Sequence, residues 1–365
     1  MSSNKYLAAL VATIALTSGI LTAAEPGTEK VLHVFDGTDG ANSTAALIFD
    51  SKGNLFGTTN KGGNYNQVCG GGCGTVFELS PAANGKWAEK VLYRFCSVEH
   101  CGDGSAPGAG GLIFDAAGNL YGTTYQGGGE SCSGGCGTVF KLSPGTNGGW
   151  TETVLYAFSG KDGSAPHSNL IFDGSGNLYG TTSAGSARGY GNAFRLTRGA
   201  DGKWTEKVLH IFSITSGPSL SGLIFDSAGD LYGTTSSQGG KTFGSVFSLA
   251  PGQNGKWTYT ALHIFYAKYA ATPLAGVIFD AAGNLYGTTV AIDGSVFELS
   301  PDTNGVWMLR ILHFFNERNG GYSPFAGLTL DPAGNLYGTA FQGGDYGGNC
   351  SQGGSGCGVI FEVTP

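Results

Sequence analysis

One stretch of sequence recurs along the whole chain and strongly limits how the chain can fold. Its clearest copy, residues 112–124, reads LIFDAAGNLYGTT, and related copies begin at Leu47, Leu170, Leu223, Val277 and Leu328. The aligned glycines are 51 to 65 residues apart: Gly53, Gly118, Gly176, Gly229, Gly283 and Gly334. A period of this size is typical of propellers and other repeat arrays. Six copies therefore indicate one repetitive body rather than two unrelated domains.

Each repeat contains four short apolar runs. In the second repeat they cover residues 112–115 (run A), 119–124 (run B), 137–142 (run C) and 150–158 (run D). All are too short for helices, are rich in β-branched and aromatic residues, and are bounded by Gly, Asn, Pro or Ser, so we expect β-strands. Four strands in each of six units predict an all-β fold, a six-bladed β-propeller with four-stranded blades.

The order of the runs predicts how the ring closes. A D-like run at residues 29–35 precedes any A run, whereas the last C run, residues 358–363, is followed only by Thr364 and Pro365. Pairing these two segments would complete the sixth blade and remove two open strand edges. We therefore expect residues 25–365 to form a single propeller domain.

The turns and the tryptophans also repeat. The A–B connection reads Asp-x-x-Gly-Asn in most units, as at residues 173–177, which is typical of a type I turn in a short hairpin loop. All five tryptophans occupy one place at the start of run D, so we expect them to pack between neighbouring blades. In a propeller, run A would line the channel. The short turns would then lie on one face, and the longer B–C and D–A loops on the other.

The N-terminus and the cysteines predict export. Residues 1–24 resemble a secretory signal peptide, with Lys5 before an apolar stretch and small residues before Glu25, and no other stretch could cross a membrane. The eight cysteines form local pairs: Cys69 with Cys73, Cys96 with Cys101, Cys132 with Cys136, and Cys350 with Cys357. An even count in an exported chain predicts disulfides. Zinc binding is the alternative, although Cys-x3-Cys is not the usual zinc spacing.

Charge limits the choice of partners. The net charge is −7 and only 12% of residues are charged, with no basic run. A nucleic-acid-binding surface needs a basic patch, so we expect no nucleic-acid partner. We expect a secreted or periplasmic monomer whose partner is an extracellular saccharide or protein.

Candidate site residues are those that do not repeat. Four of the six histidines fall in D runs, whereas His100 and His167 lie in D–A loops, where we also single out Glu99, Asp103 and Asp162 as ligand-binding candidates. The Asp-Gly pairs that begin at Asp39, Asp103 and Asp162 could bind Ca²⁺ through oxygen ligands, although Asp-Gly is also a turn signal. We identify no other cofactor and no metal site. No nucleophile elbow, H-E-x-x-H motif or phosphate-binding loop is present, so no catalytic residue is assigned.

The combined pattern of LIFD, GNLYGTT and GTVFEL resembles the GloVer tandem-repeat family of exported bacterial proteins over about residues 29–365. This resemblance implies export and a repeat body and leaves the activity open. Since the chain ends at Pro365, directly after a strand, we expect free secretion or a periplasmic location rather than surface anchoring. More distantly, the D-x-x-G-N-L-Y element looks like the repeat of streptogramin lyase and gluconolactonase-type propellers.

Three functional hypotheses follow. The first is a binding module that uses its disulfide-bearing loop face. In the alternative interpretation of that face, which we call the staple interpretation, the disulfides only stabilise long loops against proteolysis. The second is a lyase or hydrolase with a site at the channel mouth, which predicts that unrepeated polar residues converge there: His100, His167, Glu99, Arg188, Glu317 and Arg318. The third is a structural envelope or matrix component, which predicts self-association.

Overall fold

The computed structural model describes residues 32–65, 69–108, 110–236, 243–266, 271–316, 321–343 and 359–365. Four sequence predictions fall outside these ranges: the signal peptide at residues 1–24, the pairing of Cys350 with Cys357, and the enzyme candidates Glu317 and Arg318. In the described part of the chain, no helix has the length and apolarity needed to span a membrane.

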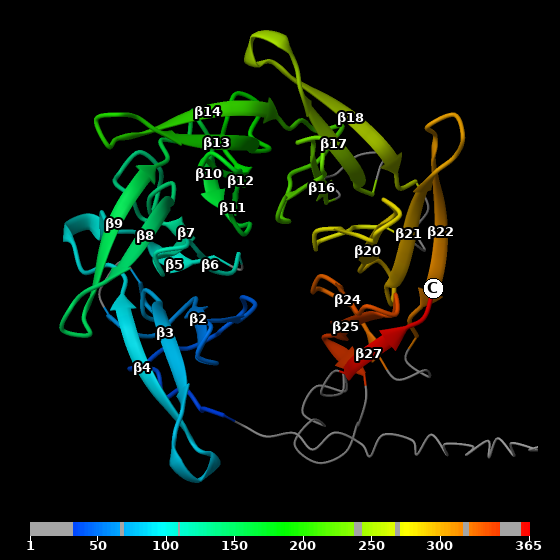
Figure 1. Cartoon of the computed structure of the whole chain (residues 1–365). Coiled ribbons are helices and arrows are strands. Elements are labelled where there is room, and N and C mark those ends of the chain that lie inside the picture. Colours follow the sequence, from blue (N-terminus) through cyan, green and yellow to red (C-terminus); the bar gives the residue numbers. More distant parts are fainter. Residues whose placement is uncertain are drawn as a thin grey trace, which may run out of the picture.

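Six antiparallel sheets are arranged around a centre, which confirms the predicted six-bladed, all-β propeller (Figure 1). The innermost A strands are β1 (Ile48–Phe49), β6 (Ile113–Phe114), β11 (Ile171–Phe172), β15 (Ile224–Phe225), β19 (Ile278–Phe279) and β24 (Thr329–Leu330). The B strands are β2 (Leu55–Thr59), β7 (Leu120–Gln126), β12 (Leu178–Ala184), β16 (Leu231–Thr235), β20 (Leu285–Thr289) and β25 (Leu336–Ala340).

The C and D strands complete the blades on the outside of the ring. The C strands are β3 (Thr75–Pro81), β8 (Thr138–Pro144), β13 (Asn192–Arg198), β17 (Ser245–Pro251), β21 (Ser295–Pro301) and β27 (Val359–Val363). The D strands are β4 (Trp87–Arg94), β9 (Trp150–Ala157), β14 (Trp204–Ile211), β18 (Trp257–Ile264) and β22 (Trp307–Phe314). Within each of the first five blades the hydrogen-bonded order is A-B-C-D, as predicted.

Several short elements lie in the loops. β5 (Ser105–Pro107) and β10 (Ser164–Pro166) pair with the ends of β7 and β12, and β23 (Gly321–Tyr322) pairs with β26 (Gln342–Gly343). The helical content of the described residues is three short 3-10 turns, η1 (Ala83–Gly85), η2 (Glu99–Cys101) and η3 (Gln253–Gly255). Part of the D–A loop of blades 2 and 3 therefore extends the sheet.

Each residue of the repeated Gly-Thr-Thr triplet has a physical role. At Gly122 an added Cβ would lie 2.7 Å from Cζ of Phe140 on the neighbouring strand, so only glycine lets that ring pack there. The hydroxyl of Thr181, the first threonine of its triplet, donates to the backbone oxygen of Ser221 in the next blade at 3.2 Å. The second threonine of a triplet bonds within its own blade, as Thr124 does with Thr138 at 2.8 Å. The triplet therefore links strands within a blade and blades around the channel.

The A–B turns have the predicted geometry. In the second blade, the backbone N–H of Gly118 donates to the oxygen of Asp115 at 3.1 Å, which closes a four-residue turn. The Asp115 carboxylate accepts the N–H groups of Ala117 and Asn119 at 2.9 Å each, and the Tyr121 hydroxyl at 3.0 Å. These bonds lower the pKa of Asp115, against the opposing and largest effect of burial. The repeated aspartates are thus turn residues, as expected.

The tryptophans pack between blades. Trp150, at the start of β9, meets Phe56 of the preceding blade with ring centroids 6.3 Å apart, and Trp257 and Trp307 meet Tyr179 and Tyr232 in the same way. The clusters around Trp150, Trp204, Trp257 and Trp307 consequently contain residues of two adjacent blades. This confirms, for these four tryptophans, the prediction that they serve packing between units.

The closing segment is only partly within the described residues. Residues 32–35 form no strand, and in the described chain β27 pairs with β25 alone. The ring of Phe35 nevertheless contacts the ring of Phe77 in the first blade, with centroids 5.1 Å apart. Phe95, which follows β4, makes the same contact with Phe140 of the second blade, with ring centroids 5.0 Å apart. The N-terminal segment therefore ends where the D strand of a sixth blade would end. The backbone pairing with residues 358–363 stays a prediction.

Candidate functional site

A cavity of about 630 Å³ lies at the centre of the ring. Its walls are formed by the residues that enter and begin the A strands, including Gly111, Ser221, Leu274 and Ile278. This position confirms that the A strands line the channel. The D–A loops end directly at these wall residues. The mouth of the cavity therefore lies on the face of the propeller that carries the long B–C and D–A loops, which we call the loop face.

The wall departs from the sixfold repeat at two positions. Directly before the first residue of each A run stands a small residue, Ala46, Gly111, Gly222, Gly276 or Gly327, except in the third blade, which has Asn169. Three residues before each run the side chains differ: Thr44, His167, Leu220, Leu274 and Phe325 line the cavity. At these two positions the third blade is therefore polar, with His167 and Asn169, whereas the fourth to sixth blades have apolar side chains or glycine.

His167 is the one titratable side chain among the described residues that line this cavity. Burial lowers its pKa below the ordinary value, although a hydrogen bond with the backbone of Leu220 acts in the opposite direction. The ring is therefore neutral at pH 7. Its Nδ1 atom is buried and has no hydrogen-bond partner. An unpaired buried polar atom costs about 1–3 kcal/mol, so this histidine is not explained by stability.

The Asn169 side chain is exposed in the channel. A Cβ added to Gly222 would lie 2.8 Å from Asn169 Oδ1. The Asn169 amide therefore lies against Gly222, the residue directly before the A run of the fourth blade. A carboxamide offers two donors and an acceptor, so this residue can bind a hydroxyl-bearing ligand in either direction.

Two pairs of rings each include one residue of the channel wall. Tyr125 meets His167 edge-on, with ring centroids 6.0 Å apart. Phe325 and Phe341 form a second edge-on pair, 5.6 Å apart, and remain 48% and 69% exposed. Large exposed apolar side chains that gather beside a cavity are typical of binding surfaces.

The other predicted site residues lie away from the channel. His100 is exposed and its Nε2 lies 3.5 Å from Oε1 of Glu130, with Glu99 exposed beside it. Arg188 is also exposed, on the loop that follows β12. The residues lining the channel include none of these three candidates, so of the described enzyme candidates only His167 reaches the channel.

Asp103 and Asp162 organise their own loops. Asp103 is buried and accepts the Tyr93 hydroxyl and the Ser97 N–H, each at 2.8 Å. Asp162 accepts the Tyr156 hydroxyl and the N–H of Ser159 in the equivalent loop. These bonds are those of the turn interpretation. Calcium binding at the Asp-Gly pairs remains an untested prediction.

One mixed group of donors could hold a metal ion. The side chains of His33, Asp39 and Glu89 place their ligand atoms within 4.8 Å of one another, and His33 Nε2 is 2.8 Å from Asp39 Oδ2. One imidazole and two carboxylates suit a cation such as Zn²⁺. In the next two blades, Tyr93 and Tyr156 take the place of the histidine. Their hydroxyl groups donate hydrogen bonds to the equivalent aspartates, Asp103 and Asp162, so these two groups are hydrogen-bonded clusters.

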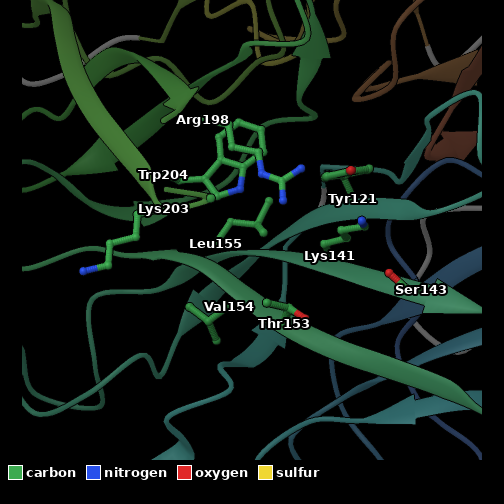
Figure 2. Close-up of a pocket in the computed structure, with 10 residues that line it drawn as sticks. Tyr121, Lys141, Ser143, Thr153, Val154, Leu155, Arg198, Lys203 and Trp204 are labelled. Carbon is green, nitrogen blue, oxygen red and sulfur yellow. The ribbon is translucent and has the colours of Figure 1, made fainter. Parts of the chain in front are cut away.

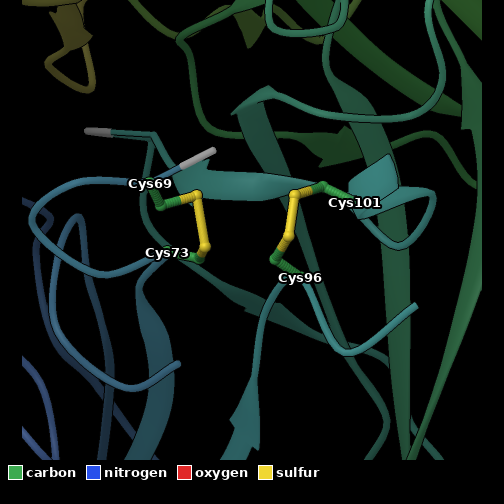
Figure 3. A group of neighbouring side chains, drawn as sticks. All are labelled: Cys69, Cys73, Cys96 and Cys101. Atoms are coloured by element: carbon green, nitrogen blue, oxygen red, sulfur yellow. A yellow bond between two sulfur atoms is a disulfide. The ribbon is translucent and has the colours of Figure 1, made fainter. Parts of the chain in front are cut away.

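Three predicted disulfides are present, and they exclude the zinc alternative for those cysteines. Figure 3 shows Cys69–Cys73 and Cys96–Cys101 side by side, one in a B–C loop and the other in the following D–A loop. Cys73 and Cys101 are buried in this arrangement. Buried disulfides at a blade joint favour the staple interpretation over a direct contact with ligand.

The remaining two cysteine pairs belong to other B–C loops. Cys132 and Cys136 form the third disulfide, in the second blade. The fourth predicted pair is that of Cys350 and Cys357, and both of these residues lie outside the described ranges. The disulfide between Cys350 and Cys357 therefore stays a prediction, and zinc binding by these two cysteines is not excluded. Mass spectrometry of a non-reduced digest would test this pairing.

Sequence reasoning found His167 but missed Asn169, Tyr125, Phe325 and Phe341. A signal was nevertheless present, because Asn169 replaces the glycine or alanine of the other repeats and the positions of Tyr125, Phe325 and Phe341 vary from repeat to repeat. Comparison of the six copies position by position, rather than a search for histidines and acids, would have identified them.

Comparison with known proteins agrees with the repeat and the fold. A sequence profile described as the Gloeobacter/Verrucomicrobia repeat matches residues 15–151 and 130–349. No curated protein matches the sequence. Among solved structures, a protein from Lactobacillus plantarum is similar with a TM-score of 0.54 and 15% identity, over 89% of each chain.

Two further solved structures are less similar. A gluconolactonase from Xanthomonas campestris has a TM-score of 0.45 and 15% identity, over 89% of this chain and 87% of its own. A periplasmic gluconolactonase from Pseudomonas aeruginosa has a TM-score of 0.46 and 15% identity, over 88% of each chain. At these identities, the solved structures bear on the fold alone.

Proposed function

The chain belongs to the Gloeobacter/Verrucomicrobia repeat family, and we propose that it is an exported binding module that takes an uncharged saccharide at the loop-face mouth of its central channel. The observation that carries the proposal is the local break in the repeat. The positions that build blades and turns are repeated, whereas the two wall positions that break the repeat are polar in the third blade and carry apolar side chains or glycine in the fourth to sixth blades.

The chemistry of the wall supports a sugar. A sugar ring has hydroxyl edges and apolar C–H faces, so it matches a wall with hydrogen-bonding groups on one side and exposed rings on another. Asn169 supplies the hydrogen bonds, and Phe325 and Phe341 supply the apolar contact. The cavity wall contains no charged side chain among its described residues, which favours an uncharged ligand.

The disulfides support a location outside the cytoplasm, since such bonds persist where thiols are oxidised. We therefore extend the proposal to a secreted or periplasmic protein. Whether it acts as a monomer is a separate prediction that sedimentation would test.

A glycan array followed by calorimetry with the best neutral oligosaccharide tests the proposal. Asn169→Gly and Phe325→Leu are the decisive variants, because Gly and Leu already occupy these positions in other repeats and should fold. Loss of a hydrogen-bonding or stacking contact should weaken binding about tenfold or more. Lys52→Ala, on an A–B turn of the opposite face, is the control and should bind normally. Binding unchanged by both channel variants would refute the proposal.

The enzyme alternative is supported by one observation, the neutral and partly unpaired imidazole of His167 in the channel. A general base needs such a group within reach of its substrate. Turnover of a bound sugar or lactone that His167→Gln abolishes, with binding retained, would favour the enzyme. A structural role would instead give self-association and no soluble ligand.

A further inference from the structure

A second cavity lies between the second and third blades, on the face of the short turns. It measures about 540 Å³ and is lined by Tyr121 of β7, Lys141 and Ser143 of β8, Thr153 of β9, and Arg198, Lys203 and Trp204 at the β13–β14 turn. An adjoining cavity of about 550 Å³ shares Tyr121, Arg198 and Trp204 and extends to the A–B turns. Together they form a groove, which we call the β8–β14 groove.

Three cations line this groove on a protein whose net charge is −7. Figure 2 shows the Arg198 guanidinium beside the Trp204 indole, and the Lys141 ammonium on the same side as the Tyr121 ring. Lys141 Nζ lies 5.8 Å from the centre of that ring. None of the ion pairs in the described chain involves Lys141, Arg198 or Lys203. In the described chain, no carboxylate oxygen therefore lies within ion-pair distance of these three side chains, and Asp201 of the same turn accepts the backbone N–H of Lys203 at 3.0 Å.

The nearest acids are already committed to the turns. No Asp or Glu is among the described residues that line the first cavity. Asp115 and Asp173 line the adjoining one, and each carboxylate accepts hydrogen bonds within its own turn, as Asp173 does from Ser175 and Asn177 at 2.9 Å each. An anion in the first cavity would thus meet cations and hydroxyls.

Two of the three cations, Arg198 and Lys141, differ from the residue that is commonest at their positions in the repeats. Arg198 pairs with Trp204 across the C–D hairpin, where the other described repeats have Pro81, Pro144, Pro251 and Pro301 opposite their tryptophans. Lys141 occupies the place of Glu78, Glu298 and Glu362, and of Arg195 and Ser248. The blade frame tolerates an acid or a proline at these positions, so folding does not require the two cations.

We propose that the β8–β14 groove binds an anionic sugar unit, whose charged group is a carboxylate or a sulfate ester. A guanidinium binds both groups in a bidentate manner, and a lysine adds a point charge. Trp204 and Tyr121 offer apolar faces to the sugar ring, and Ser143 and Thr153 offer hydroxyl groups for hydrogen bonds. The groove is on the opposite face from the channel mouth, so this site is separate from the proposed function.

The test uses calorimetry of the purified disulfide-bonded protein with oligouronate, sulfated oligosaccharide and a neutral oligosaccharide of equal length. We expect binding of at least one anionic probe, weakened by salt, and no binding of the neutral probe in this groove. The uronate and sulfate arms identify the charged group. If neither anionic probe binds, the proposal is wrong.

Matched variants place the site. Arg198→Pro and Lys141→Glu each introduce a residue that other repeats have at that position, and each should weaken binding about tenfold or more. Lys203→Ala should also weaken it, whereas Lys86→Ala, the equivalent change in the first blade, should not. Asn169→Gly should leave anion binding unchanged, so the channel proposal can fail without affecting this one. Normal binding by folded Arg198→Pro and Lys141→Glu proteins would overturn the inference.

Discussion

The backbone oxygen of Cys136 accepts a 2.8 Å hydrogen bond from the N–H of Ala165, and this bond joins the second blade to the third. Ala165 has a positive φ of 53°, which lets Pro166 turn back over Gly137 of the preceding blade. The same bond recurs between Cys73 and Ala106 at 2.8 Å, and, without a disulfide, from Thr272 to Phe243 at 2.6 Å. The disulfides therefore hold in place the residues that accept this hydrogen bond between neighbouring blades, a bond that recurs along the fold.

Removal of the Cys132–Cys136 disulfide should loosen this joint. The double change Cys132→Ser and Cys136→Ser is expected to lower the free energy of unfolding by about 2 kcal/mol, because the crosslink restricts a short loop in the unfolded chain. Thermal unfolding measures the effect, and a reductant should lower the melting temperature of the wild type more than that of the variant. Equal melting temperatures for the two oxidised proteins would contradict the staple interpretation.

Gly137 and Gly118 offer a matched pair of glycine-to-alanine changes. Both have a positive φ, 90° and 80°, so both should lose roughly 1 kcal/mol or more from backbone strain. At Gly137 an added Cβ would also collide with the backbone oxygen of Thr124, whereas at Gly118 it would meet open space. Chemical denaturation should show Gly137→Ala as clearly the less stable variant. Equal stability would show that the joint can relax around a methyl group.

Stability should fall as the pH rises above the ordinary histidine pKa of 6.5, because below that value the buried histidines, whose pKa is lowered, act in the opposite direction. Burial, together with the nearby charge of Asp103, raises the pKa of Glu152 to about 8, and burial near Asp162 raises that of Glu206 to about 7. A raised folded-state pKa means that the folded protein holds the proton more tightly than the unfolded chain. This stabilisation is complete below the ordinary glutamate pKa and is lost as the pH rises through 7 to 8.

The variant Glu152→Gln should flatten this pH dependence, because an amide keeps the shape of the carboxyl group without ionising. Melting temperatures measured between pH 4.5 and 8.5 check the effect, with Glu99→Gln on an exposed loop as the control. If the wild type were most stable at pH 8, the assignment of a neutral, half-buried Glu152 would be wrong.

Deletion of residues 25–35 should destabilise the sixth blade. In the described chain Ile360 of β27 is 83% exposed, whereas Val76, Val139 and Val246, at the same position in other blades, are fully buried under a D strand. Residues 29–35 have the composition to cover it. Hydrogen exchange at residues 359–363 should be faster after the deletion, and deletion of residues 25–28 alone should have little effect. Unchanged exchange would contradict the predicted closure.

Much of the fold could be predicted because its causes are local or periodic. Asp115 and Gly118 form their turn through bonds within a few residues. Trp150 and its equivalents repeat because each blade must pack on the previous one. The local cysteine pairs that the structure describes lie close enough in the chain that a small loop joins them.

The candidate sites were less accessible to sequence reasoning. His100 and His167 look alike in sequence, as unrepeated histidines in D–A loops, yet one lies against Glu130 at the surface and the other reaches the channel. Their loops enter different blades and differ in length, and only backbone packing decides where each side chain ends. Likewise, nothing in the local sequence indicates that Lys141 and Arg198 line one groove.

The number of blades, the strand order of the first five, the turns and three local disulfides could be predicted from the amino-acid sequence alone, because they follow from short-range chemistry and from a repeated pattern. Which unrepeated residues share a cavity depended on the folded ring. His167 and Phe325 become walls of one channel, and Lys141 and Arg198 sides of one groove, because ring closure and blade packing bring together positions that are far apart in the chain.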